Sequence, residues 1–204
     1  MKRQIVTYLI LLLCSSAIGA NPQKEQPKVT FGLEWGYVAT FFDGRHYNFF
    51  DPEGFRVNMQ SQKLSYTTNG EILVHAGYNF NELWNLSLYA GYSGAGEHQP
   101  VLPIFLRATR YMGGTHLQDR WFAFLDAGSG ICMQQKPQEI FTGRLGCGYR
   151  LSLSRYTKLD FMAGLRMLYT HTEINHYGEI ISNELINRSE GHIASLNISI
   201  ALTF

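Results

Sequence analysis

The sequence predicts an all-β protein, an eight-stranded antiparallel up-and-down transmembrane β-barrel. Apolar and polar residues alternate repeatedly with a period of two, as in strands whose two faces meet different surroundings. The composition combines 45% hydrophobic and 14% aromatic residues with only 16% charged residues, against about 25% charged residues in ordinary soluble domains. Short connections alternate with longer ones, which is typical of barrels with short turns at one rim and longer loops at the other.

The start of the chain has the pattern of a secretory signal peptide. Two basic residues precede a short apolar run, and small residues follow up to Ala20. The run is too short to span a bilayer as a helix, which needs about 20 residues. We expect residues 1–20 to be cleaved after Sec-dependent export, leaving a short periplasmic lead-in over 21–28 and a barrel over 29–204.

Eight segments in turn show the strand pattern. In the first, Phe31, Leu33 and Trp35 alternate with glycines and Glu34. The fifth is the least regular, yet its apolar residues still alternate with Asp126 and two glycines. The segments are close to the about 9–11 residues that a tilted strand needs to cross a bilayer. In chain order they are 29–42, 71–80, 83–92, 102–110, 121–130, 141–151, 159–169 and 192–204.

The connections follow a regular order of length. Those after the second, fourth and sixth strands are short, and those after the third and fifth are intermediate. The connections after the first and seventh strands are long, from Phe42 to about Leu64 and from His171 to about Gly191. We therefore expect two long loops on the outer side of the membrane.

The outward-facing aromatic residues sort into two groups. If the first strand starts at the periplasm, one group lies near each end of the strands, and aliphatic residues lie between them. Rings at headgroup level on both sides of an apolar band are typical of membrane barrels. The periplasmic group is Phe31, Phe80, Trp84, Trp121, Tyr149 and Phe204, and the outer group is Tyr37, Tyr92 and Tyr169.

The last strand carries apolar residues at alternate positions and ends on an aromatic residue: Ile198, Ile200, Leu202 and Phe204. In this respect the chain resembles the small outer-membrane β-barrel proteins of Gram-negative bacteria, of the OmpA/OmpX type and the Bacteroidetes outer-membrane β-barrel domain. In those families such an ending is the signal read by the barrel-assembly machinery. The resemblance implies the outer membrane as location, with its lipid and that machinery as partners, and implies no particular activity.

The inward-facing positions carry a set of charged and titratable side chains. The turns expected around Gln135 and Arg155 place Asp126 opposite Arg144, and Arg150 opposite Asp160. Unpaired buried charges are costly, and eight strands leave a lumen that side chains fill. We therefore predict a network that plugs the lumen, with a narrow ion or small-solute channel as the alternative. Its members are Glu34, Glu71, His75, Arg107, Asp126, Arg144, Arg150, Asp160 and Arg166.

An enzyme that modifies lipids is a third interpretation. His75 lies near Ser87 and Tyr89 if the intervening turn aligns the strands, which would give a base beside a hydroxyl group. Glu71 is four residues away on the same strand, about 13 Å at strand rise, and so is too far to orient the imidazole. We therefore expect no enzyme activity, no catalytic residues, no cofactor and no metal site.

The first outer loop is dense in aromatic residues: His46, Tyr47, Phe49, Phe50 and Phe55. Exposed aromatic residues at this density can mark a surface for an extracellular ligand. They can equally pack on the barrel rim or on one another, and the sequence leaves both readings open. A nucleic-acid partner is not expected, because the formal net charge is only +1 and no basic stripe is visible.

Two cysteines follow the signal peptide, Cys132 and Cys147. The expected register sets the first opposite Gln138 near a loop and the second opposite Ala123 far down the wall. A disulfide needs Cα atoms within about 7 Å. We therefore expect no bridge between them.

Overall fold

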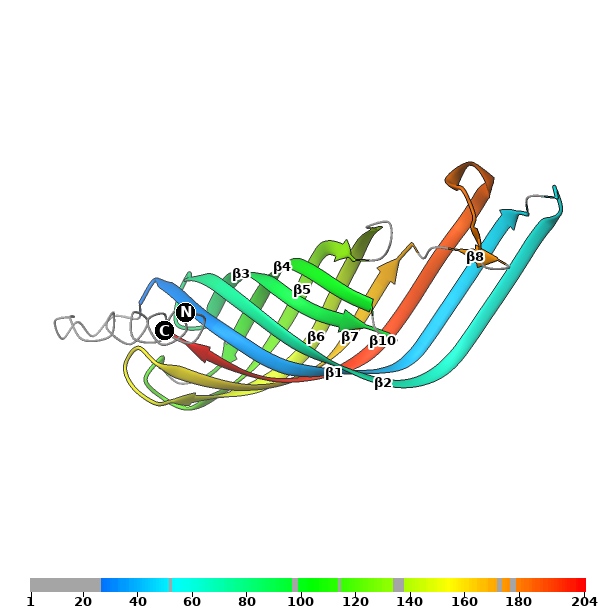
Figure 1. Cartoon of the computed structure of the whole chain (residues 1–204). Helices are drawn as coiled ribbons and strands as arrows, with labels where there is room; N and C mark the ends of the chain where they lie inside the picture. The colour runs from blue at the N-terminus through cyan, green and yellow to red at the C-terminus, as the bar shows by residue number, and fades with distance from the viewer. Residues whose placement is uncertain are drawn as a thin grey trace, which may run out of the picture.

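The computed structural model describes residues 27–51, 53–96, 99–113, 115–133, 138–171, 174–176 and 179–204. Eight long strands close into one barrel in the order β1-β10-β7-β6-β5-β4-β3-β2, and every neighbouring pair is antiparallel (Figure 1). The predicted fold class is confirmed. The expected signal peptide and residues 21–26 of the lead-in lie outside the described residues.

The barrel strands are β1 (Val29–Phe50), β2 (Arg56–Asn79), β3 (Trp84–Ala95), β4 (Gln99–Met112), β5 (Arg120–Cys132), β6 (Gln138–Ser152), β7 (Lys158–Thr170) and β10 (Ile186–Thr203). A small hairpin, β8 (Asn175–His176) and β9 (Glu179–Ile180), and a 3₁₀ turn over Asn183–Leu185 lie between β7 and β10. No helix among the described residues is long and apolar enough to cross a membrane.

The barrel is apolar outside and polar inside. In β7, for example, Leu165 is 55% exposed whereas its neighbour Arg166 is 3% exposed. The same alternation runs along the other strands, so that large apolar side chains cover the outer wall and charged or hydroxyl side chains are buried. This arrangement reverses that of a soluble domain and is the arrangement of a transmembrane barrel.

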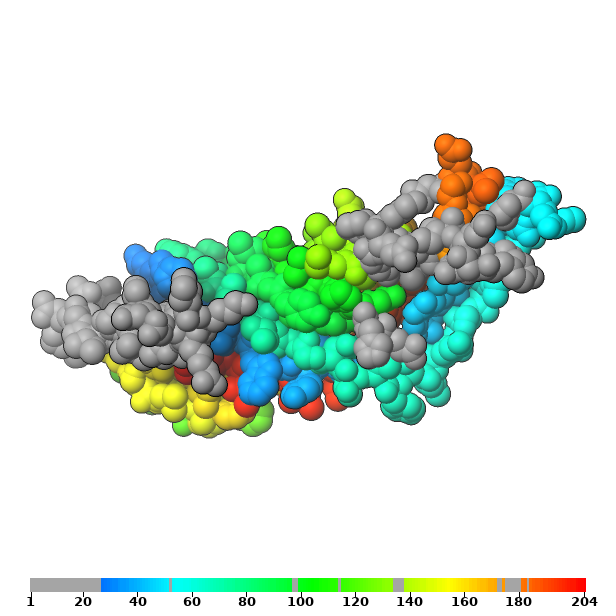
Figure 2. Space-filling view, viewed as in Figure 1, coloured from blue at the N-terminus to red at the C-terminus, as the bar shows by residue number. Residues whose placement is uncertain are grey.

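Three strands extend far beyond the rest of the barrel. β1, β2 and β10 have 22, 24 and 18 residues, against 12 to 15 in the other barrel strands. Their excess length forms a three-stranded sheet, β2-β1-β10, that rises from one rim (Figures 1 and 2). We call this sheet the projection and define it as residues 42–50, 56–64 and 186–190. The opposite rim, where β1 begins and β10 ends, is the terminal rim.

The projection corrects the expectation of a long first outer loop, whereas the connection after β7 is long as expected and runs from Thr170 to Ile186. The first connection is only a tight turn over 51–55, in which the Asp51 carbonyl accepts the Gly54 amide at 2.8 Å. The connections after β3 and β5 are short as well, not intermediate. The sequence did not reveal the extra strand length, because only a small apolar cluster around Phe49 covers this sheet and neither of its faces is buried along its whole length. A shift in register between Thr40 and Phe42 further interrupts the pattern.

Glycines on the inner face let aromatic rings pack across the lumen. A Cβ at Gly128 would lie 2.3 Å from the Ile104 carbonyl oxygen and 2.4 Å from Cβ of Phe105. A Cβ at Gly146 would lie 2.5 Å from the ring of Phe124. Any side chain at these positions would therefore displace the backbone or a buried ring.

The two cysteines lie at different levels of the wall. Cys132 is opposite Gln138 and Cys147 is opposite Ala123, as the sequence predicts. The first is buried and the second is exposed on the outer wall.

Candidate functional site

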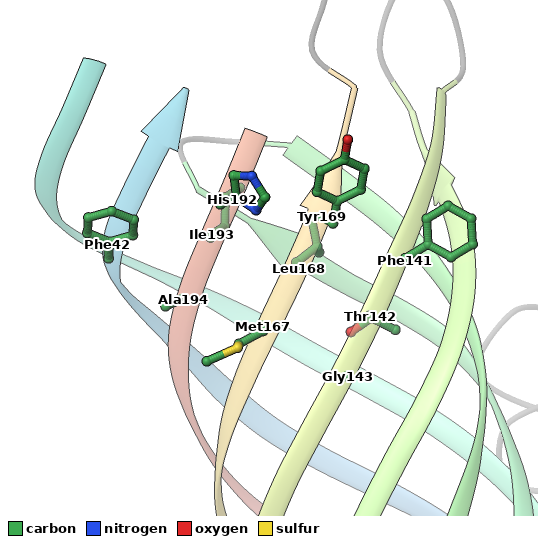
Figure 3. Close-up of a pocket in the computed structure, with 10 residues that line it drawn as sticks. All are labelled: Phe42, Phe141, Thr142, Gly143, Met167, Leu168, Tyr169, His192, Ile193 and Ala194. Atoms are coloured by element: carbon green, nitrogen blue, oxygen red, sulfur yellow. The ribbon is translucent and has the colours of Figure 1, made fainter. Parts of the chain in front are cut away.

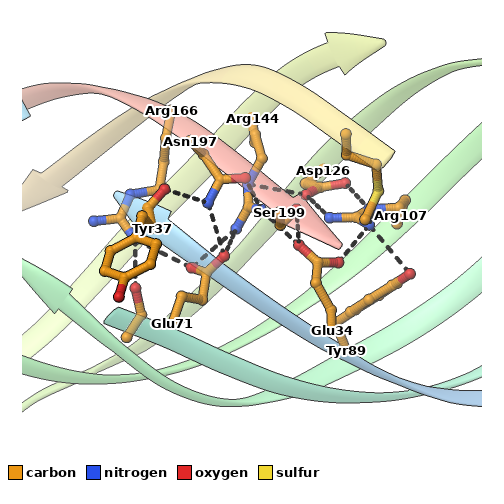
Figure 4. Close-up of polar contacts among 12 residues, drawn as sticks. Glu34, Tyr37, Glu71, Tyr89, Arg107, Asp126, Arg144, Arg166, Asn197 and Ser199 are labelled. Carbon is orange, nitrogen blue, oxygen red and sulfur yellow. Dashed lines mark hydrogen bonds and ion pairs between the residues drawn. The ribbon is translucent and has the colours of Figure 1, made fainter. Parts of the chain in front are cut away.

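Six charged side chains from six strands meet in the middle of the lumen (Figure 4): Glu34, Glu71, Arg107, Asp126, Arg144 and Arg166. Each is at most 4% exposed. If all are ionised, three carboxylates balance three guanidinium groups, and the cluster is neutral. We call these six residues the lumen network.

Asp126 links two of the guanidinium groups. It accepts two hydrogen bonds from Arg107, Nε to Oδ1 at 2.8 Å and Nη2 to Oδ2 at 2.9 Å. Nε of Arg144 lies 3.3 Å from Oδ2 of the same carboxylate. Asp126 and Arg144 are direct cross-strand partners, in the register that the sequence predicts.

Glu34 and Glu71 close the network from the opposite wall. Glu34 accepts from Arg107 at 2.8 Å and from Arg144 at 3.2 Å. Glu71 lies 3.0 Å from Arg144 and 3.4 Å from Arg166. Each carboxylate therefore contacts two guanidinium groups, which is the pairing that buried charges require.

Neutral side chains that were not predicted as members of the network make further hydrogen bonds to it, although Nε of Arg144 and Nε of Arg166 have no hydrogen-bond partner. Ser199 donates to Glu34 at 2.9 Å, and Asn197 donates to Glu71 at 3.1 Å. Arg166 donates to Ser93 at 2.7 Å, and Arg107 donates to the hydroxyl of Tyr89 at 3.1 Å. All of these residues occupy inward-facing positions of strands in which outward and inward residues alternate. This alternation could have identified them from the sequence.

Three residues expected in the network lie apart from it. Arg150 donates two hydrogen bonds to Asp160, from Nε at 2.7 Å and from Nη2 at 2.6 Å, and the two form a separate pair. The guanidinium of Arg150 lies over the ring of Tyr111. His75 stacks on Tyr89 with ring centroids 4.7 Å apart, and no ion pair joins it to a described carboxylate. The expectation that His75 belongs with the charges is therefore not met, because its ring packs in an aromatic layer.

Apolar layers lie on both sides of the lumen network. Towards the projection, a layer of buried side chains comes from the ends of six strands: Ala95, Val101, Cys132, Ile140, Leu168 and Ile193. Towards the terminal rim, a second layer contains Tyr111, Phe122, Phe124, Met162 and Ala201. A cavity of about 20 Å³ beside His75 and Arg150 lies at the level of this second layer, which is room for about one water molecule. The described side chains thus occupy the lumen at the level of the network and of the two apolar layers.

The aromatic cluster expected in an outer loop lies instead on β1 of the projection, apart from Phe55 in the turn. Phe49 is buried against Ile174 and Ile181, and Tyr47 packs on the edge of this cluster. Phe50 and Phe55 are exposed, and His46 hydrogen-bonds Asn58 across to β2 at 3.0 Å. Some of the predicted binding residues therefore pack on one another, and only part of the set is available to a ligand.

The outer edge of β2 lacks a neighbouring strand along most of its length. β2 pairs with β3 only from Ile72 to Asn79, whereas its pairing with β1 continues up to Arg56. Among the described residues, no strand pairs with this edge from Arg56 to Glu71. Lys63 is the single charged residue between these two ends, and the segment contains no proline. We call residues 56–71 the open edge.

The other margin of the projection belongs to β10. Arg188 hydrogen-bonds Glu190 at 2.6 Å and holds the pKa of that carboxyl below its ordinary value. His171 contacts the Ser189 carbonyl oxygen at 2.8 Å. This margin is therefore polar and carries a pair of compensated charges.

The residues of the expected assembly signal lie on the last strand. Ile198 and Ile200 are exposed on the outer wall, and Leu202 is partly buried. The backbone of Phe204 exchanges two hydrogen bonds with Phe31, at 2.7 and 3.0 Å. The last residues thus close the barrel against its first strand, so that no unpaired edge faces lipid there.

No protein-family model matches the chain, and no curated protein matches it. The outer membrane protein OprG from Pseudomonas aeruginosa matches with a TM-score of 0.49 and 12% identity, over 88% of this chain and 97% of OprG. Neisserial surface protein A matches with a TM-score of 0.42 and 12% identity, over 85% of this chain and 97% of its own. A de novo designed transmembrane β-barrel matches with a TM-score of 0.42 and 12% identity, over 89% of this chain and all of its own. At such identities and TM-scores, this chain is similar to these proteins in barrel architecture alone.

Proposed function

We propose that this protein is a sealed outer-membrane barrel that presents the projection to the outside and binds extended polypeptide segments along the open edge. The observation that carries the proposal is the open edge itself, a stretch of β2 without a strand partner among the described residues. The barrel acts as an anchor, and the projection carries the specificity.

The membrane location is supported by the outer wall. Exposed Leu, Ile and Val side chains form an apolar band, with Trp121 and Phe31 towards the terminal rim and Tyr37 and Tyr92 towards the projection. Aromatic girdles on both sides of an apolar band match the two headgroup regions of a bilayer. The short turns at the terminal rim then face the periplasm, and the projection faces outward.

Strand addition is supported by the chemistry of the open edge. Unpaired backbone N–H and C=O groups are a template for another strand, and proteins usually protect such edges with charges, proline or bulges. Between its ends, Arg56 and Glu71, the open edge has one charged residue, Lys63, and no proline, and its one irregularity is the register shift opposite Thr40 and Phe42. Its exposed Leu64 and Tyr66 would contact alternate side chains of an added strand, which is how β-augmentation gains specificity.

The proposal assigns no enzyme role to the barrel. The imidazole of His75 is stacked on Tyr89, and its Nε2 lies 3.5 Å from the Thr203 hydroxyl. A general base acts within hydrogen-bond reach of its substrate, about 2.6–3.2 Å between heavy atoms, or through one water molecule. This geometry supports a packing role for His75.

The test is selection of 12-residue peptides on the refolded barrel, followed by amide hydrogen exchange of the complex. We expect selected peptides to slow exchange within residues 56–71 and to lose binding when Leu64 and Tyr66 are replaced by lysine. The Phe50→Lys variant is the matched control, because Phe50 is exposed on the central strand of the projection and pairs with Arg56, far along β2 from Leu64 and Tyr66. Peptides that bind the lysine variant equally well, or that leave exchange in 56–71 unchanged, would contradict strand addition.

A further inference from the structure

A groove of about 480 Å³ lies on the outer wall, just below the projection (Figure 3). It spans four adjacent strands, β1, β10, β7 and β6. Its volume falls within the range of about 300–1,000 Å³ that small-molecule pockets occupy. Neither the lumen network nor the open edge uses this surface.

Small residues create the floor of the groove. One row of cross-strand partners runs Phe42, Ala194, Met167 and Gly143. Ala194 and Gly143 leave the backbone uncovered between larger side chains, and Figure 3 shows the rings of Phe42 and Phe141 on the two sides. The result is an apolar groove with an aromatic ring on each side, Phe42 on one and Phe141 on the other.

The groove is continuous with the lipid-facing wall on its lower side. The next outward-facing row towards the membrane consists of aliphatic partners: Ala39, Leu196, Leu165 and Leu145. All of the leucines in this row are exposed on the outer wall. An occupant of the groove must therefore be in contact with the hydrocarbon of the outer leaflet, which points to an acyl chain.

The upper side of the groove is polar. His192 and Tyr169 are cross-strand partners with ring centroids 5.0 Å apart, and Tyr169 also contacts His171. Above His192 on the same face of β10, Arg188 and Glu190 pair at 2.6 Å. The Tyr169 phenol and the Arg188 guanidinium both already hydrogen-bond Glu190. The imidazole of His192 and the remaining lone pair of the phenol oxygen are therefore the groups left for a ligand hydroxyl. A headgroup phosphate would need a cation that is not already paired, so sugar hydroxyls are the better complement.

We propose that the groove binds one acyl chain of an outer-leaflet glycolipid, whose sugar hydroxyls hydrogen-bond His192 and Tyr169. This inference rests on the membrane orientation proposed above, and it is independent of strand addition at the open edge. A bound lipid would cover the backbone that Gly143 and Ala194 leave exposed in the wall.

The test is native mass spectrometry of the refolded barrel mixed with three lipids that share dimyristoyl chains: a diglucosyl diacylglycerol, phosphatidylethanolamine and phosphatidylglycerol. We expect the wild-type barrel to retain one molecule of the glycolipid in preference to either phospholipid. Gly143→Leu should reduce retention at least about tenfold, the equivalent of about 1.4 kcal/mol. The fold should tolerate this change, because a Cβ at Gly143 would meet only one atom within 4 Å, at 3.8 Å.

Two further variants separate binding from folding. Ala76→Leu is the matched control, because Ala76 is exposed on the outer wall of β2 and lies outside both the groove and the open edge. His192→Ala should weaken retention several-fold, and His192→Gln should restore it in part through a side-chain amide. Equal retention by wild type and Gly143→Leu would overturn the site, and preferential retention of either phospholipid would overturn the glycolipid assignment. Peptide selection on Gly143→Leu tests strand addition separately, so that the two proposals fail independently.

Discussion

Replacing Asp126 by asparagine tests whether the lumen network holds the barrel together. The change keeps the shape of the side chain and one acceptor oxygen, and it removes one of three negative charges. Asp126 is 2% exposed and contacts both Arg107 and Arg144. The variant would therefore bury one uncompensated positive charge.

The expected loss of stability depends on the carboxylate contacts that Arg107 and Arg144 retain in the variant. Removing one partner of a buried ion pair costs about 3–5 kcal/mol. Arg107 retains Glu34 at 2.8 Å, and Arg144 retains Glu34 and Glu71. The loss should therefore lie at the lower end, about 3 kcal/mol in the free energy of unfolding.

The assay is urea unfolding of the barrel in lipid vesicles, followed by tryptophan fluorescence. Trp35, Trp84 and Trp121 all face outward and report the loss of a lipid-facing wall. Asp43→Asn is the matched control, because Asp43 pairs with Arg45 at 2.8 Å in a more exposed position. The two side chains are 15% and 31% exposed, so this pair should contribute less than a buried pair and closer to the about 0–1 kcal/mol of surface pairs.

The comparison of the two asparagine variants decides the outcome. If Asp126→Asn lowers the free energy of unfolding by no more than Asp43→Asn does, the lumen network does not stabilise the barrel. In addition, a double-mutant cycle of Arg107 and Asp126 measures the interaction energy of this pair, which should be large if the two side chains are in contact. No coupling in that cycle would contradict the geometry described above.

Three further outcomes follow from the structure. The wild-type barrel should show no conductance steps in planar bilayers, because apolar layers close the lumen on both sides of the network. Steady single-channel steps would show that the barrel is a channel and not a plugged anchor. Gly128→Ala should lower the free energy of unfolding by about 1–3 kcal/mol, because a Cβ there would lie 2.3 Å from the Ile104 carbonyl oxygen, and Gly70→Ala, measured by the same urea titration, should be close to neutral. Deletion of Phe204 removes its two backbone hydrogen bonds to Phe31 and should reduce the amount of folded barrel in outer-membrane fractions, whereas unchanged amounts would count against an assembly signal at this end.

The sequence by itself determined the barrel wall. Alternation with a period of two is a local property, so it assigned Leu165 outward and Arg166 inward without knowledge of the rest of the fold. Short turns fix the register of adjacent strands. For that reason the sequence placed Asp126 opposite Arg144 and Arg150 opposite Asp160, as the structure has them.

Only the tertiary structure decided how the inward side chains combine. Glu34 and Arg107 are 73 residues apart and come from strands that are not neighbours, so no local pattern relates them. Their contact exists because the closed barrel brings opposite walls within reach of an arginine side chain. His75 and Tyr89, in contrast, are cross-strand partners in the hairpin of β2 and β3, as the sequence predicts, and their stacking leaves the imidazole outside the lumen network.

The projection also depended on tertiary structure. Residues 42–64 show no regular alternation, because both faces of the sheet they form lie outside the barrel wall. Their polar composition therefore predicted a loop, whereas backbone pairing with β10 and across the 51–55 turn makes them strands. Periodicity reports where one face of a strand is buried, and a sheet of which only a small part is covered is specified by its hydrogen-bonded neighbours instead.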